Sequence, residues 1–191
     1  PEEPVTVGAL CFTDYYFEFK RQQVEAFSHV QGVLDRVAKE FKGVSGRSYS
    51  AIETYGMEDA EAAVLCLGST AGTAREVAHT LRAQGKKVGI VKIWLYRPFP
   101  VDEVKAALKN VKALAVFDKS ISFGAQYGAV CSDVVSALHT VDKRPRIFNV
   151  IFGLGGRDIK PSDIEHVFNE ALETTKTGAV KQETLFLGVR E

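Results

Sequence analysis

Residues 63–67 read AVLCL, an unbroken apolar run, and the next three residues read GST. A short, continuous apolar run is typical of a strand that is buried on both faces of a sheet, whereas a strand with one solvated face alternates between apolar and polar residues. Residues 73–83 then have helical spacing, with Val77, Ala78 and Leu81 on one face. The stretch therefore predicts a strand, a tight turn and a covering helix, which together form the unit of a parallel α/β sheet.

The same alternation continues along the chain. Further strands are predicted at residues 88–96, 114–117 and 146–152. Further helices are predicted at residues 100–109, 125–139 and 161–174. The half-polar run at 49–55 suits the edge of a sheet, where an antiparallel strand is allowed. We therefore expect an α/β fold: a three-layer α/β/α open mixed sheet of about five strands, mostly parallel, with an antiparallel edge strand.

A long N-terminal helix is predicted over residues 14–41. Five apolar residues step 3-4-3-4 along one face, and they are Phe27, Val30, Leu34, Val37 and Phe41. Gly43 and Gly46 are expected to end the helix. Twenty-eight helical residues span roughly 42 Å, which exceeds what a small sheet can cover. Part of this stripe is therefore expected to contact another domain or subunit, with Phe27 and Leu34 as candidate interface residues.

Composition excludes several classes of function. The chain has 191 residues, with 24 basic and 24 acidic side chains, so it has no net charge to attract nucleic acid or an anionic membrane. No apolar run is long enough to span a membrane, and no secretory pattern is present. The sequence thus predicts a cytoplasmic protein with no nucleic acid or membrane as partner.

Cysteine and histidine positions predict no metal site. Cys11, Cys66 and Cys131 are far apart and form no C-x-x-C pair, so we expect reduced, buried thiols rather than a zinc or iron–sulfur site. The four histidines are isolated as well. No pair of a nucleophile and a base can be read, so no catalytic residue is predicted.

Three loops are candidates for binding. Residues 68–73 combine small residues with the start of a helix, which is a natural place for an anion, and the candidates are Gly68, Ser69, Thr70, Gly72 and Thr73. No lysine follows these glycines, so this is not a G-x-x-x-x-G-K-[ST] nucleotide loop. The structural alternative is that the hydroxyl of Ser69 or Thr70 caps the helix.

The second loop, residues 153–158, reads GLGGRD. A dinucleotide fingerprint would need glycine where Asp158 stands. Arg157 and Asp158 therefore suggest a contact across a subunit boundary, a docking loop or a local ion pair. The third loop is residues 118–124, in which Asp118, at the end of a predicted strand, either orients a ligand or caps or turns the chain.

Six segments together carry a resemblance to a known family. They are residues 6–10 (TVGAL), 14–16 (DYY), 46–49 (GRSY), 67–73 (LGSTAGT), 97–100 (RPFP) and 153–158 (GLGGRD). With these segments the sequence resembles the C-terminal part of the alpha chain of pyruvate:ferredoxin oxidoreductase and the other 2-oxoacid:ferredoxin oxidoreductases. The resemblance implies a fold similar to the C-terminal domain of transketolase.

The resemblance also implies an organisation and a role. Residues 1–46 would form a linker and long helix that join an upstream domain missing from this sequence, residues 47–178 a transketolase C-terminal-like domain, and residues 179–191 a C-terminal tail. The family oxidatively decarboxylates a 2-oxoacid to acyl-CoA and CO2 in anaerobic metabolism, and for this chain the resemblance favours pyruvate. It uses thiamine diphosphate with Mg, [4Fe–4S] clusters and coenzyme A.

This chain alone is expected to bind none of these cofactors and to be inactive. Its expected partners are a thiamine-diphosphate-binding beta chain, a gamma chain and a cluster-bearing delta chain, with ferredoxin reached through the complex. The candidate interface residues are Phe27, Leu34, Arg97, Phe99, Gly155, Gly156, Arg157 and Asp158. Two alternatives are a stand-alone phosphate- or nucleotide-binding module that uses residues 68–73, and an assembly piece of a different thiamine enzyme.

Overall fold

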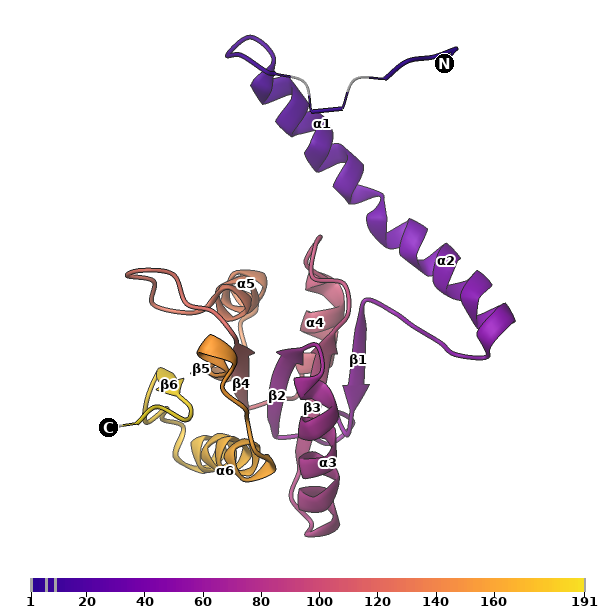
Figure 1. The fold of residues 1–191 in the computed structure, drawn as a ribbon. Helices are drawn as coiled ribbons and strands as arrows, with labels where there is room; N and C mark the ends of the chain where they lie inside the picture. The colour runs from indigo at the N-terminus through magenta and orange to yellow at the C-terminus, as the bar shows by residue number, and fades with distance from the viewer. Residues whose placement is uncertain (1, 6, 9, 191) are drawn as a thin grey trace. The chain divides into compact units, whose positions relative to one another are not determined.

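The structure is a computed structural model that describes residues 2–5, 7–8 and 10–190. Pro1 of the expected linker, Thr6 and Ala9 of the TVGAL segment, and Glu191 of the expected tail lie outside the described residues. The chain divides into two compact units, Pro1–Ser48 and Tyr49–Glu191. Figure 1 shows the helices and strands of each unit.

The first unit contains two helices where the apolar spacing predicts one. Helices α1 (Tyr16–Ser28) and α2 (Val30–Ser45) meet at His29, whose N–H donates to the carbonyl of Ala26 at 3.2 Å, as in a tight three-residue turn. Gly46 adopts a left-handed conformation with φ 72° and ends α2, as expected, whereas Gly43 lies inside the helix. No residue of α1 or α2 is buried. The expected stripe is therefore present but interrupted at His29.

The second unit is a six-stranded sheet in the order β1-β3-β2-β4-β5-β6. The strands are β1 (Ile52–Tyr55), β2 (Ala62–Leu67), β3 (Val88–Ile93), β4 (Ala113–Asp118), β5 (Arg146–Ile151) and β6 (Thr184–Phe186). Strand β1 pairs antiparallel with β3 at one edge, with Ile52 opposite Ile93, and the other pairs are parallel. The mostly parallel sheet with an antiparallel edge strand is confirmed.

The sixth strand is a difference from the expected count of about five. Strand β6 lies within residues 179–191, where the sequence predicts a tail, and it pairs parallel with β5. The N–H of Asn149 donates to the carbonyl of Glu183 at 2.8 Å, and the N–H of Leu187 donates to Ile151 at 2.8 Å. These bonds continue the sheet to the C-terminal segment.

Helices cover both faces of the sheet (Figure 1). Helices α3 (Thr70–Ala83) and α6 (Pro161–Thr177) contribute to one buried cluster, and α4 (Val101–Leu108) and α5 (Ala129–Leu138) contribute to the other. Alternate residues of β2 divide between the two clusters, because successive side chains of a strand point to opposite faces. This is the three-layer α/β/α arrangement expected from the apolar strands.

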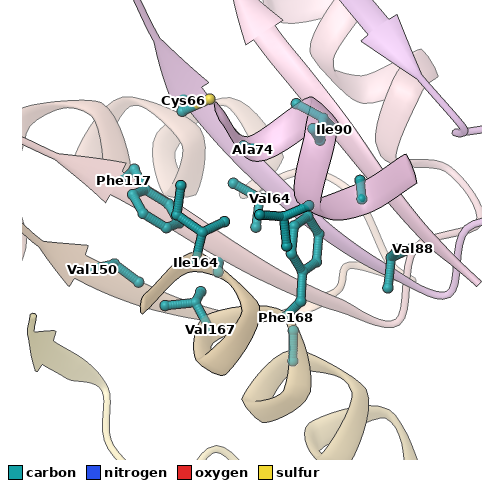
Figure 2. Packing of buried hydrophobic residues seen from close by; sticks show 14 of the residues in the cluster. Val64, Cys66, Ala74, Val88, Ile90, Phe117, Val150, Ile164, Val167 and Phe168 are labelled. Atoms are coloured by element: carbon teal, nitrogen blue, oxygen red, sulfur yellow. The ribbon is translucent and has the colours of Figure 1, made fainter. Parts of the chain in front are cut away.

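Figure 2 shows the first cluster, in which Phe168 and Ile164 of α6 lie over the sheet near Val64 and Phe117. Phe168 and Ile164 are both completely buried. Full burial of a side chain of this size stabilises a fold by about 1.5–3 kcal/mol. The helix α6 is thus held on the sheet mainly by apolar packing.

Candidate functional site

The order of the strands reverses between β2 and β4, which places a crevice at their carboxyl ends. Helix α3 follows β2 on one face of the sheet, and α5 follows β4 on the opposite face. In open α/β sheets, ligands bind at this kind of switch point. A cleft of about 360 Å³ lies there, bounded by the residues that follow β2 (Gly68, Ser69 and Thr70) and by those that follow β4 (Lys119 and Ser120). We call it the switch-point cleft.

Asp118 lies at the back of this cleft and caps helix α5. Its carboxylate accepts hydrogen bonds from the N–H groups of Val130 (2.8 Å) and Cys131 (3.0 Å), and from the side-chain amide of Asn149 (2.9 Å). Asp118 is only 1% exposed. Of the two roles open to it from the sequence, the structure supports capping, because its oxygens are occupied by protein donors.

Asn149 completes this buried network, and sequence reasoning missed it. Its Nδ2 also donates to the carbonyl of Val116 at 2.9 Å, and its Oδ1 accepts the N–H of Gly128 at 2.7 Å. A side chain at Gly128 would overlap the carboxyl group of Asp118. The only signal in the sequence is an asparagine inside an otherwise apolar strand, where an unpaired amide would be unfavourable.

The start of helix α3 differs from the capping arrangement considered from the sequence. Ser69 occupies the N-cap position with φ −69° and ψ −25°, and no side-chain hydrogen bond caps the helix. A capping residue normally takes an extended conformation so that its hydroxyl reaches the N–H two or three residues on. The hypothesis that Ser69 or Thr70 caps this helix is therefore wrong. Of the other anion candidates, Gly72 and Thr73 lie in the first turn of α3, and Gly68 has φ +65°.

Arg97 and Phe99 lie on the loop between β3 and α4, which is held against α5. The guanidinium of Arg97 donates to Asp133 at 2.8 Å, and the hydroxyl of Tyr96 donates to the same carboxylate oxygen at 2.7 Å. Phe99 is half-buried and makes an edge contact with Tyr96. Burial, together with the hydrogen bond to Asp133, raises the pKa of Tyr96. Arg97 thus has a partner within this chain, although its side chain is half exposed.

The segment 153–158 forms a short 3-10 turn at Leu154–Gly156 after β5. Gly155 and Gly156 are exposed, with φ of 65° and 82°, in the left-handed region that favours glycine. The guanidinium of Arg157 donates to the carbonyl of Gly188, so it ties this loop to the segment after β6. Asp158 is exposed.

The remaining interface candidates belong to the first unit. Phe27 is 41% exposed at the end of α1, and Leu34 is half-buried in α2. They are in different helices, because the break at His29 separates them.

Thiols and acidic groups do not assemble into a metal site among the described residues. Cys66 is buried in the cluster on one face of the sheet and Cys131 in the cluster on the other face. Cys11, in the first unit, is only half-buried, so the expectation of a buried thiol is wrong for this residue. No group of three His, Cys, Asp or Glu side chains within residues 2–5, 7–8 and 10–190 is arranged to hold a metal ion. In the same residues, no helix has the length and apolar character that a membrane crossing requires.

Comparison with known proteins identifies the family. Residues 60–164, which contain β2 to β5 and the switch-point cleft, match the family described as "Pyruvate:ferredoxin oxidoreductase core domain II". The chain belongs to this family. The resemblance drawn from the six sequence segments is confirmed.

Several curated proteins resemble this core domain II chain over its length. It is 44% identical to pyruvate synthase subunit PorA of Thermotoga maritima, over 100% of this chain and 47% of that protein. It is 37% identical to PorA of Pyrococcus abyssi, over 100% of this chain and 48% of that protein. It is 36% identical to ketoisovalerate oxidoreductase subunit VorA of Pyrococcus horikoshii, over 95% of this chain and 46% of that protein. The chain thus spans about half the length of these relatives.

Proposed function

We propose that this core domain II chain is a non-catalytic positioning part of the alpha subunit of a 2-oxoacid:ferredoxin oxidoreductase. In this proposal the whole enzyme converts a 2-oxoacid, coenzyme A and oxidised ferredoxin into acyl-CoA, CO2 and reduced ferredoxin, and other chains or domains carry out the chemistry. Pyruvate is the favoured substrate, because pyruvate synthase subunit PorA of Thermotoga maritima is 44% identical to this chain, whereas the VorA relative is 36% identical.

The placement of exposed apolar side chains in the second unit carries this proposal. Among the described residues from Tyr49 onward, every large apolar side chain that is exposed lies at the carboxyl edge of the sheet or on the loops there, and these residues are Tyr49, Trp94, Val101, Phe123, Leu154, Phe186 and Val189. Phe123, on the loop after β4, is fully exposed. Apolar side chains gathered on one face are typical of a protein–protein interface. We call this set the carboxyl-edge apolar surface.

A second apolar surface lies on the first unit. Phe27 of α1 and Val37 and Phe41 of α2 are each exposed by 40–51%. An amphipathic helix in water normally packs its apolar stripe against another element. In our proposal the neighbouring domains and subunits cover both this stripe and the carboxyl-edge apolar surface, and this packing holds the reacting parts of the enzyme in place.

The cofactors of such an enzyme would belong to its other parts. A [4Fe–4S] cluster does not fit this chain, because Cys66 and Cys131 lie on opposite faces of the sheet. Asp118, which lies at the switch-point cleft, does not fit as a ligand for the magnesium of thiamine diphosphate because its oxygens accept protein N–H groups, and no group of three potential metal ligands is present within residues 2–5, 7–8 and 10–190. We therefore derive no reaction step through these groups.

Affinity purification from the source organism tests this assignment. The protein would be tagged at its chromosomal locus and isolated without oxygen, and co-purifying chains would be identified by mass spectrometry. We expect chains that bind thiamine diphosphate and chains that carry iron–sulfur clusters. Recovery of the protein without any oxidoreductase chain would contradict the proposal.

A further inference from the structure

We propose that the switch-point cleft binds the phosphate group of a small molecule, with Thr70, Ser69 and Lys119 as its principal contacts. This site is separate from the packing role described above and does not depend on it. The argument begins with the α3 terminus, which no side chain caps. The N–H groups of Ser69 and Thr70 have no hydrogen-bond acceptor within the part of the chain that the structure describes.

Thr70 supplies the observation that distinguishes this helix start from an ordinary one. Thr70 is only 6% exposed to solvent, yet its hydroxyl makes no hydrogen bond with any described residue. No completely buried side-chain polar atom in the described chain lacks a partner, so the hydroxyl retains a little exposure, and Thr70 is a lining residue of the cleft. Nearly buried hydroxyls are usually hydrogen-bonded, so this one is available to a ligand.

The electrostatics of the cleft favour an anion on the side of β2 and α3. Helix α3 has 14 residues, and its N-terminus presents partial positive charge to the cleft. Lys119 lines the opposite wall, with its ammonium 5.4 Å from the ring of Phe152 and with no carboxylate in ion-pair range among the described residues. The hydroxyls of Ser69 and Ser120 add further donors, because both residues line the cleft.

Asp118 is the acidic residue that lines the cleft, and its negative charge is stabilised by hydrogen bonds within the protein. Three N–H donors from α5 and β5 occupy its oxygens at 2.8–3.0 Å. The N–H groups of Val130 and Cys131 in the first turn of α5 are therefore already used, so we assign the anion to the α3 start. Gly68 also lines the cleft, and a Cβ built there would meet no atom within 4 Å, so there is open space beside this wall.

A titration of the full chain with inorganic phosphate, followed by ¹⁵N NMR, tests the site. The expected result is saturable shifts at the amides of Ser69, Thr70 and Ala71, with chloride at equal ionic strength giving none. Pyrophosphate and ADP would be titrated in parallel to show whether the phosphate is free or part of a larger molecule. Shifts that do not saturate, or equal shifts at the starts of α4 and α6, would overturn the proposal.

Two variants and two matched controls make the test specific. Thr70→Val keeps the shape of the side chain and removes the hydroxyl, and Lys119→Gln removes the charge from an exposed position. Each is expected to raise the phosphate Kd about tenfold, as for loss of a hydrogen bond to a charged group. Thr80→Val, on the outer face of α3, and Lys109→Gln, at the end of α4, are expected to leave Kd unchanged. Unchanged binding in both Thr70→Val and Lys119→Gln, with native-like spectra, would refute the assignment.

Discussion

The side-chain amide of Asn149 donates a hydrogen bond of 2.9 Å to the carboxylate of Asp118, and both residues are essentially inaccessible to solvent. This pair connects β4 to β5 and, through Gly128, Val130 and Cys131, fixes the start of α5. A residue that looks like a ligand-binding carboxylate in the sequence is thus a structural element behind the switch-point cleft.

Removing the Asp118 carboxylate is expected to destabilise the second unit strongly. Asp118→Ala leaves two backbone N–H groups and one of the two N–H bonds of the Asn149 amide buried without an acceptor. Each unsatisfied group costs about 1–3 kcal/mol, so we expect a loss of about 3 kcal/mol or more in the free energy of unfolding. Urea denaturation of the full chain measures this loss, and a change below about 1 kcal/mol would show that the network is not structural.

Gly128→Ala is expected to destabilise the protein by about 1–3 kcal/mol, because the new methyl group would overlap the carboxyl group of Asp118. The φ of −66° at Gly128 is accessible to alanine, so the effect would come from packing alone. Gly72→Ala in α3 is the matched control. Its Cβ meets nothing within 4 Å, and replacing a helical glycine stabilises by about 0.5–1 kcal/mol. Equal effects of the two substitutions would contradict this account.

The buried thiols are expected to be inert in the native protein. Burial raises the pKa of Cys66 to about 12, and burial together with the charge of Asp118 raises the pKa of Cys131 to about 12. At pH 8 both groups are therefore protonated, and thiolate is the reactive form. Alkylation with iodoacetamide followed by mass spectrometry should modify Cys11 in the native chain and all three cysteines in urea. Rapid native modification of Cys66 or Cys131 would disagree with their burial.

An ion pair between Asp59 and Arg82 is expected to give a small, pH-dependent contribution to stability. The Arg82 guanidinium donates a 2.8 Å hydrogen bond to Asp59 and holds the pKa of that carboxyl below its ordinary value. A lowered pKa in the folded state contributes stability above the ordinary pKa, and this contribution disappears as the pH falls below about 4. Asp59→Asn should therefore lower stability at pH 7 and have a smaller effect at pH 3. Glu58→Gln is the control variant. A larger loss of stability from Asp59→Asn at pH 3 than at pH 7 would contradict the expected pH dependence.

Phe123→Ser tests the carboxyl-edge apolar surface. The side chain is fully exposed, so the free energy of unfolding is expected to change by less than about 0.5 kcal/mol. Under the proposed function, recovery of partner chains from cell extract would fall. Lys143→Ser, at an exposed position before β5, is the surface control and should recover partners normally. Undiminished recovery with Phe123→Ser would show that this side chain lies outside the interface.

The continuous apolar strands were the most predictable part of the fold. Strand β2 consists of the predicted run at 63–67 and one further residue, Ala62. This strand was predictable because every residue of a strand that is buried on both faces tends to be apolar. Strand β6 has only three residues, and its hydrogen bonds to β5 are tertiary, so the local sequence does not predict it. The break at His29 was missed for a related reason, because the 3-4-3-4 spacing of apolar residues passes through it without interruption.

The candidate site likewise has some features that the sequence predicts and others that it does not. The position of the Gly68–Thr73 loop at a helix start followed from the pattern of small residues, and the structure places it there. The capping role given to Ser69 or Thr70 was wrong, since cap geometry depends on backbone angles that the residue type does not fix. Asn149 comes beside Asp118 only through the pairing of β4 with β5, and Lys119 reaches the cleft because it follows β4 at the switch point, so both positions become evident only once the strand order is known.

The central claim is that this chain positions other parts of a 2-oxoacid:ferredoxin oxidoreductase and supplies no reacting group. The most direct measurement is pyruvate-dependent viologen reduction, with thiamine diphosphate, magnesium and coenzyme A added, by the purified 191-residue chain and by the assembly isolated through it. We predict activity in the assembly and none in the chain alone. Turnover by the isolated chain would contradict the claim. So would an assembly that fails to reduce viologen with every 2-oxoacid that is supplied to it.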